Sequence, residues 1–319
     1  MRKGIVLLLA LGLATLWGCP GHPSRQAADK PRHIYIADTI NHRVVRIDDM
    51  TGKGWKSLGT TASLETNHFD KPQGLYVNED EHIYVADTGN CRIVRMDDMQ
   101  GLNWEVFGRR GEGASQFNQP TSVFIDGSEH LHVADKNNDR ITVTDDMTGT
   151  HWIDLGKQGT RENQFSYPAA IFVDASEHIY VADTTNLPAG VTNNRIVRMD
   201  DMYGLGWVSF TGPFANPAGL FVDHANHIYI ADTGNNRIAR MDDMKGKNLV
   251  FLGGPGGGPL KFNQPIGIFV DDDGQIYIAD SGNDRIVRID DMAGKGWTAF
   301  GTTGKGDGQF NTPCGIFVR

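Results

Sequence analysis

The stretch that decides the fold runs from Ile276 to Gly301 and reads IYIADSGNDRIVRIDDMAGKGWTAFG. It contains three short runs of apolar, aromatic and β-branched residues, which favour β-strands: 276–279, 286–289 and 297–300. The segments between these runs are rich in Asp, Asn, Ser and Gly, the composition of tight turns. A further strand-like run, 267–270, precedes them after the breaker FNQP at 262–265. The stretch therefore predicts a sheet of four short antiparallel strands.

The same unit recurs six times between residue 33 and the end of the sequence. The second strand of every copy ends in an aspartate, and successive aspartates are 48 or 49 residues apart. These residues are Asp38, Asp87, Asp135, Asp183, Asp232 and Asp280. A four-stranded unit repeated at a fixed period is typical of a β-propeller, in which each blade packs against its neighbours. We therefore predict an all-β, six-bladed propeller with four-stranded antiparallel blades.

The order of the copies also predicts how the ring closes. Every blade should begin with an innermost strand, but the first copy begins at His33 with its second strand. The last strand-like run, 315–318, follows the sixth copy and can supply the missing inner strand of blade one. Pairing of these two chain segments would remove an exposed sheet edge.

The repeat resembles the NHL-repeat family. Residues 262–289, FNQPIGIFVDDDGQIYIADSGNDRIVRI, carry the family pattern Phe-x-x-Pro-x-Gly-Ile-x-Val-Asp followed by Ile-Tyr-Val-Ala-Asp-x-x-Asn-x-Arg-Ile. The resemblance extends over residues 33–319 and implies the NHL type of six-bladed propeller. It implies little about activity, because this fold carries many unrelated functions. Lyases and lactonases with a site in the central channel have propellers that resemble the NHL type, and some NHL propellers bind RNA.

Residues 1–19 predict an export signal. Arg2 and Lys3 form a basic start, and Ile5–Trp17 is an apolar run too short to span a bilayer comfortably. The run ends in LWGC, which resembles the cleavage box of bacterial lipoproteins, in which Cys19 would become the lipidated N-terminus. Trp17 departs from that pattern, and the alternative is cleavage by the ordinary signal peptidase without a lipid.

The predicted domains follow from these assignments. Residues 20–32 are polar and rich in proline, which predicts a flexible linker, and residues 33–319 form the propeller. We expect an exported protein that is anchored in the membrane through its N-terminal lipid and faces the periplasm or the cell exterior.

The formal net charge of −9 argues against nucleic acid or an anionic membrane face as a partner, because both reward clustered Lys and Arg. We expect no nucleic-acid partner, although RNA binding by some NHL propellers is the competing hypothesis. We also expect a monomer without a cofactor.

Residues that recur in every blade are interpreted as structural. The strand-end aspartate precedes an arginine by five residues, which predicts an ion pair across each turn, and by twelve in blade four, from Asp183 to Arg195. The extra segment 187–192 includes Leu187 and Val191 and is a candidate contact site. The motif Asp-Asp-Met predicts an aspartate-capped hairpin with Met and the following Trp packed between blades; the alternative is a calcium loop.

Histidine opens the second strand in five blades: His33, His82, His130, His178 and His227. A zinc site is disfavoured because equivalent residues of neighbouring blades are too far apart to share one ion. We expect exposed turn residues that meet acids such as Glu81, Glu129 and Glu177.

The inner ends of the blades should converge on the channel and bring together Gln73, Thr121, Ala169, Ala218, Ile266 and Cys314. This ring contains no His, Asp or Glu, which predicts an apolar mouth and disfavours a metal-dependent hydrolase. Cys314 is a candidate nucleophile, but the inner strands hold no histidine to activate it. Cys91 and Cys314 belong to different blades, and we expect both thiols to be unpaired.

The loops between blades differ most among the copies and carry Arg109, Arg110, Lys157 and Arg161. Variation on a fixed scaffold is typical of a binding surface. We therefore predict a protein- or ligand-binding scaffold of the bacterial cell envelope rather than an enzyme, with a lyase or lactonase that holds a metal in the channel as the alternative. The candidate ligand-binding residues are Gln73, Thr121, Arg109, Arg110, Lys157, Arg161, Leu187, Val191, Ile266 and Cys314.

Overall fold

The computed structural model describes residues 32–185 and 193–319. The predicted signal peptide with Cys19, most of the linker, and the candidate residues Leu187 and Val191 lie outside the described residues. Arg32–Arg319 forms one compact unit. Within the described residues, no helix has the length and apolar character needed to cross a membrane.

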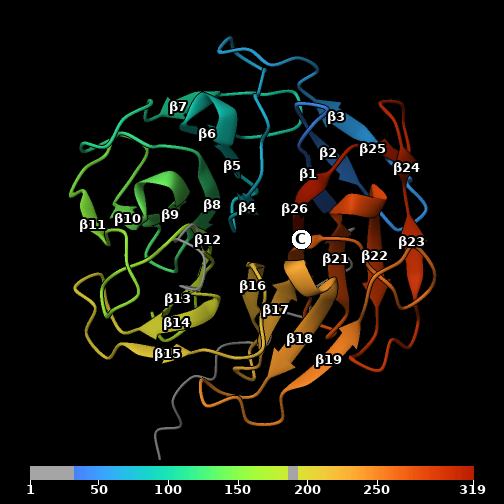
Figure 1. The fold of residues 1–319 in the computed structure, drawn as a ribbon. Helices are drawn as coiled ribbons and strands as arrows, with labels where there is room; N and C mark the ends of the chain where they lie inside the picture. The colour runs from blue at the N-terminus through green and yellow to red at the C-terminus, as the bar shows by residue number, and fades with distance from the viewer. Residues whose placement is uncertain (1–31, 186–192) are drawn as a thin grey trace, which may run out of the picture. The chain divides into compact units, whose positions relative to one another are not determined.

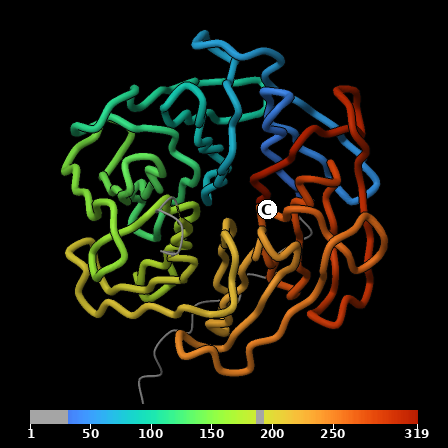
Figure 2. The backbone as a smooth tube through the Cα atoms, viewed as in Figure 1, coloured from blue at the N-terminus to red at the C-terminus, as the bar shows by residue number. Residues whose placement is uncertain are grey.

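Six four-stranded antiparallel sheets surround a central axis, which confirms the predicted six-bladed propeller (Figure 1; Figure 2). Blade one contains β26 (Pro313–Val318), β1 (Ile34–Asp38), β2 (Arg43–Ile47) and β3 (Lys56–Leu58). Blade two contains β4 (Leu75–Val77), β5 (Ile83–Asp87), β6 (Arg92–Met96) and β7 (Glu105–Phe107). Blade three contains β8 (Pro120–Ile125), β9 (Leu131–Asp135), β10 (Arg140–Thr144) and β11 (Ile153–Leu155).

Blade four contains β12 (Pro168–Val173), β13 (Ile179–Asp183), β14 (Arg195–Met199) and β15 (Val208–Phe210). Blade five contains β16 (Pro217–Val222), β17 (Ile228–Asp232), β18 (Arg237–Met241) and β19 (Val250–Gly253). Blade six contains β20 (Pro265–Val270), β21 (Ile276–Asp280), β22 (Arg285–Ile289) and β23 (Thr298–Phe300). Two short strands, β24 (Thr302–Thr303) and β25 (Gln309–Phe310), pair in parallel within the last inter-blade loop.

Within the described residues, single 3₁₀ turns connect the second and third strands of blades two, three, five and six: η1 (Thr88–Asn90), η2 (Lys136–Asn138), η3 (Thr233–Asn235) and η4 (Ser281–Asn283). These turns and the inter-blade loops lie at the same end of the blades, which we call the loop face. The opposite end carries the hairpins between the first and second and between the third and fourth strands, and we call it the hairpin face.

The C-terminal strand closes the ring as predicted. β26 pairs with β1, with Ile34 opposite Val318 and Ile36 opposite Ile316. The pairing extends one residue further, where the backbone N–H groups of His33 and Arg319 each donate to the carbonyl of the other residue. Blade one therefore has the same four-stranded sheet as the other blades although its inner strand comes from the far end of the chain (Figure 1).

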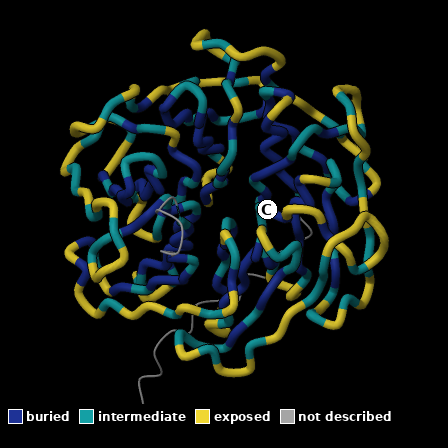
Figure 3. The backbone as a smooth tube through the Cα atoms, viewed as in Figure 1, coloured by how far each residue is buried: buried dark blue, intermediate teal, exposed yellow. Residues whose placement is uncertain are grey.

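The core lies between the blades rather than at one centre. Six buried clusters each combine side chains of two neighbouring blades, so that burial follows the sheets around the ring (Figure 3). In five blades the tryptophan that follows Asp-Asp-Met packs on the phenylalanine that opens an inter-blade loop segment, with ring centroids 5.1 to 5.5 Å apart. The predicted packing of Met and Trp between blades is confirmed.

The six predicted Asp–Arg pairs all form, with Nε to Oδ2 distances of 2.7 to 2.9 Å, including Asp183–Arg195 across the longer turn. Each aspartate is fully buried. The guanidinium does more than hold its own turn: Arg140 also donates to the carbonyls of Glu112, Gly113 and Gln116 in the preceding inter-blade loop. The recurrent pair therefore fixes the loop face as well as the sheet.

In Asp-Asp-Met, the second aspartate accepts a backbone N–H two residues later at 2.8 or 2.9 Å in all six copies, which confirms the predicted cap. No His, Cys, Asp or Glu group in the described chain has the arrangement of a metal site, so the calcium alternative finds no support there.

The expected histidine partners were wrong in detail. His130 and His178 contact Asp126 and Asp174, at 3.0 and 2.9 Å, rather than the adjacent Glu129 and Glu177. The reason is the tight turn itself, in which the aspartate directly after the first strand accepts the histidine backbone N–H and so lies beside the ring.

Candidate functional site

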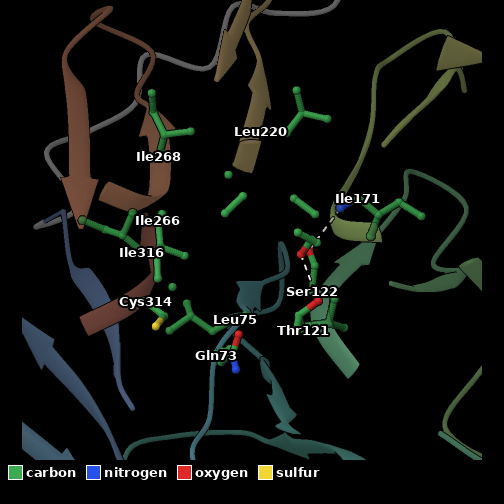
Figure 4. Close-up of a pocket in the computed structure, with 18 of the residues that line it drawn as sticks. Gln73, Leu75, Thr121, Ser122, Ile171, Leu220, Ile266, Ile268, Cys314 and Ile316 are labelled. Atoms are coloured by element: carbon green, nitrogen blue, oxygen red, sulfur yellow. Dashed lines mark hydrogen bonds between the residues drawn. The ribbon is translucent and has the colours of Figure 1, made fainter. Parts of the chain in front are cut away.

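A cavity of about 170 Å³ lies on the propeller axis between the inner strands β4, β8, β12, β16, β20 and β26. It brings together the ring that the sequence predicts, and Figure 4 shows Gln73, Thr121, Ile266 and Cys314 around it. Ala169 and Ala218 also line it. Among the described residues that line the cavity there is no His, Asp or Glu, so the donors for a channel metal are missing from this wall.

Small residues let the inner strands approach each other. A Cβ atom at Gly74 would lie 2.6 Å from the carbonyl oxygen of Thr121 in the next blade. Gly219, Gly267 and Gly315 stand in the same relation to the next inner strand. The glycines therefore make the channel mouth narrow at the level of the backbone.

The body of the channel is apolar. Leu75, Ile171, Leu220, Ile268 and Ile316 line the cavity, and Figure 4 shows them distributed around it. Closer to the hairpin face, six aromatic rings, one from each inner strand, form a closed belt in which every ring contacts both neighbours at centroid distances of 4.8 to 5.1 Å. These residues are Tyr76, Phe124, Phe172, Phe221, Phe269 and Phe317.

Two of the predicted ring residues have internal roles. The Thr121 hydroxyl donates to the carbonyl of Ala169 at 3.0 Å, and its neighbour Ser122 accepts the backbone N–H of Ile171 at 3.3 Å. Cys314 is buried, and burial raises the pKa of its thiol to about 11. A thiol that stays protonated at neutral pH is a poor nucleophile, so the structure gives the nucleophile hypothesis no support. Both described cysteines, Cys91 and Cys314, are free thiols.

Sequence reasoning missed Lys136, which also lines the cavity. It occupies the first position of η2, where all five sister blades have a hydroxyl residue: Thr39, Thr88, Thr184, Thr233 and Ser281. Lys136 is half-buried, and burial lowers the pKa of its ammonium group. Its Nζ lies 5.5 Å from the ring centroid of Tyr167, the residue before Pro168 at the start of β12. The signal in the sequence was the exchange of a hydroxyl residue for a lysine within an otherwise regular turn.

The predicted basic residues Arg109, Arg110, Lys157 and Arg161 do not line the channel. All four are exposed on inter-blade loops of the loop face. The loops that carry them share one conformation, because parallel bridges join Arg110 to Phe117 and Gln158 to Phe165. Equivalent pairing joins Pro255 to Phe262 and β24 to β25 in two further loops. These four loops therefore differ in side chains but not in backbone pattern.

A second cavity of about 260 Å³ lies between blades three and four on the hairpin face. His132, which replaces the tyrosine of the other second strands, is 4% exposed and contacts Asp126 Oδ2 through Nε2 at 2.8 Å. His130 binds the same oxygen at 3.0 Å. Burial alone would raise the pKa of Asp126, but the hydrogen bonds from His132 and His130 outweigh burial and hold that pKa well below its usual value. In this cluster the buried His132 and the more exposed His130 both engage the same carboxylate oxygen of Asp126.

Three segments match the model of the NHL repeat: residues 69–96, 214–241 and 262–289. Each begins at the inter-blade phenylalanine and ends with the third strand, so the matched unit is offset from the structural blade. No curated protein sequence matches the chain.

Solved structures are similar in fold. A chain of a nidogen/laminin complex superposes with a TM-score of 0.69 at 17% identity, covering 90% of this chain and 98% of that chain. A streptogramin B lyase has a TM-score of 0.57 at 16% identity, with 90% and 88% covered. Virginiamycin B lyase from Staphylococcus aureus has a TM-score of 0.56 at 14% identity, with 81% and 77% covered. At these identities the likeness establishes the propeller fold, whereas function depends on the site.

Proposed function

We propose that this chain is an exported, lipid-anchored propeller that binds a partner protein of the cell envelope through its loop face. The observation that carries the proposal is the contrast between a rigid loop backbone and different exposed side chains at its tips.

The rigidity has a clear structural origin. The Arg140 guanidinium and the Asn138 side chain hold the loop of residues 109–117 through its carbonyls, while Arg109 and Arg110 remain exposed. The next loop is held in the same way by Arg195, which donates to the carbonyls of Thr160, Arg161 and Gln164. A preorganised surface loses little conformational entropy on binding, so its exposed side chains contribute more of their interaction energy to affinity.

The chemistry of the loop face fits a protein surface. It displays the basic residues Arg109, Arg110, Lys157 and Arg161 together with Leu64, which is 69% exposed. Arginine and exposed apolar side chains are typical anchors of protein interfaces. A propeller of similar fold occurs in a nidogen/laminin complex, which supports the choice of a protein partner.

The proposed binding can be tested by measuring how much of each envelope protein the purified chain recovers from the native envelope. We expect Arg109→Glu/Arg110→Glu to recover a specific partner at least about tenfold less than the wild-type chain, because reversed rim charges oppose association. The matched control is Lys245→Glu/Lys247→Glu, an exposed double charge reversal on the hairpin face, which should recover it normally. Equal recovery by the wild type and by the Arg109/Arg110 variant would contradict the proposal.

The anchor is tested separately through Cys19. We expect the mature chain to begin at this cysteine and to carry the mass of the added lipid, and processing to be blocked by globomycin. Cys19→Ala should then release the propeller from the membrane. An unlipidated mature N-terminus at any other position would contradict the anchor but leave the binding proposal standing.

A further inference from the structure

The channel has one charged group in an otherwise apolar wall. Of the described residues that line the axial cavity, only Lys136 carries a charge at neutral pH. Within residues 32–185 and 193–319, its ammonium group has no hydrogen bond or ion pair, and its one directional contact is with the Tyr167 ring at 5.5 Å. Cys314 is not a counterion, because its thiol pKa of about 11 keeps it neutral. Removing a charged group from water without a partner costs free energy, and a bound anion would offset that cost.

Lys136 replaces a hydroxyl side chain that has a structural role in sister blades. In four other blades the equivalent hydroxyl donates to the carbonyl of the proline that begins the next inner strand, as Thr88 does to Pro120 at 2.7 Å. In blade three the corresponding carbonyl, that of Pro168, faces the Thr121 hydroxyl at 3.5 Å instead. The exchange therefore gives up a recurrent structural contact and places an amine at the channel mouth.

Two departures from the repeat meet at this point. Tyr167 precedes the proline of β12 at a position where the sister blades carry Lys71, Gln119, Asn216, Gln264 and Thr312. Its backbone N–H donates to Asp139 at 2.9 Å, and its carbonyl accepts the Thr184 hydroxyl at 2.6 Å, so the backbone of this residue is held on both sides. The lysine and the aromatic ring come from neighbouring blades, and the ring packs against the ammonium group of a residue that lines the cavity.

We infer that the channel binds a small monocarboxylate whose carboxylate pairs with Lys136 at the loop-face mouth and whose apolar body occupies the channel. One ammonium balances one negative charge, and a dianion would bring an uncompensated charge into an apolar cavity. The walls of Leu75, Ile171, Leu220 and Ile316 and the aromatic belt fit an aryl or branched-alkyl body. Gln73 also lines the cavity and supplies an amide N–H₂ group that can donate to an oxygen of a bound ligand.

The site differs from the partner surface proposed above. It uses the channel interior, whereas the proposed protein interface uses the exposed loop tips, so loss of either one leaves the other intact.

The test is calorimetric titration of the full chain with phenylacetate, 3-phenylpropionate and hexanoate, each compared with its neutral amide. We expect at least one acid to bind with a dissociation constant below about 1 mM and its amide to bind at least about tenfold more weakly. Lys136→Thr restores the residue of the sister blades and should abolish the preference for the acid without lowering the unfolding temperature. Lys305→Thr, an exposed position on the same face that does not line the channel, is the matched control and should bind as the wild type does.

The pH dependence gives a second measurement. An ordinary lysine loses its charge near pH 10.4, and burial lowers the pKa of Lys136 below that value. As the pH rises, affinity for the acid should therefore begin to fall below pH 10.4. The Lys136→Thr variant should lack this dependence. Three results would each overturn the inference: none of the acids binds, the amides bind as tightly as the acids, or Lys136→Thr retains the wild-type preference.

Discussion

Closure of the ring by the C-terminal strand can be tested with two matched substitutions. Ile316 in β26 and Ile268 in β20 occupy the same position of the inner strand, and each is 6% exposed. One strand reaches its sheet from the far end of the chain, whereas the other is continuous with its own blade. If closure holds in solution, Ile316→Ala and Ile268→Ala should destabilise the propeller equally.

The magnitude follows from burial. Truncation of a buried isoleucine to alanine costs about 2 to 5 kcal/mol, which includes the lost transfer energy and the cavity left behind. Both side chains border the axial cavity, so we expect the lower part of this range, about 2 to 3 kcal/mol for each variant. If β26 did not pair with β1, Ile316 would lie on a solvated tail and its truncation would change the free energy of unfolding by less than about 0.5 kcal/mol.

Urea unfolding followed by tryptophan fluorescence and far-UV circular dichroism measures both free energies. Thermal unfolding gives an independent check, with roughly 2 to 4 °C lost for each kcal/mol. A cost of 2 kcal/mol or more for Ile268→Ala together with almost none for Ile316→Ala would refute closure by this strand.

Three further predictions concern individual side chains. Cys91 has a left-handed backbone (φ 53°), and its sulfur accepts the Gln119 N–H at 3.5 Å. The sister residue Asn236 suits this backbone and offers a better acceptor, so Cys91→Asn should raise the free energy of unfolding in urea by about 1 kcal/mol. A loss of stability would argue against a turn-capping role for this position. Asp126→Asn should cost about 2 kcal/mol at pH 7 because the charge-assisted bond to His132 is lost. The lowered pKa of Asp126 makes this contribution complete above the unfolded-chain value of about 4 and lost as the pH falls further, so a cost that persists unchanged at pH 2 would contradict the assignment. The thiol of Cys314, with a pKa of about 11, is roughly 0.1% ionised at pH 8. Its alkylation, followed by peptide mass spectrometry, should therefore be far slower in the native chain than in the unfolded chain. Equal rates would exclude burial of this thiol.

Much of the fold could be predicted from the sequence because every blade faces the same packing problem. The period of the strand-end aspartates, the Asp–Arg pairs and the caps of Asp-Asp-Met are local features, formed by residues two to twelve positions apart. Comparison of six copies separates such features from the rest without any other sequence. The glutamates expected beside His130 and His178 were wrong because the aspartate that caps each turn accepts the histidine backbone N–H and therefore also lies beside the ring.

The candidate site was predicted only in part. The inner-strand register placed Gln73, Thr121, Ile266 and Cys314 around one axis, as the structure has them. Lys136 was not predicted because the expected ring contained residues of the inner strands alone, whereas this residue reaches the channel from a turn between the second and third strands.

The sequence by itself determined the number of blades, their strands and the turns that join them, since these depend on contacts within one repeat. Only the tertiary structure decided which departures from the repeat lie together. Lys136 of blade three contacts Tyr167 at the entry to blade four and lines the same cavity as Cys314 of the closing strand. Their proximity depends on the packing of neighbouring blades and on the reach of a long side chain from a turn into the channel, and residue spacing encodes neither property.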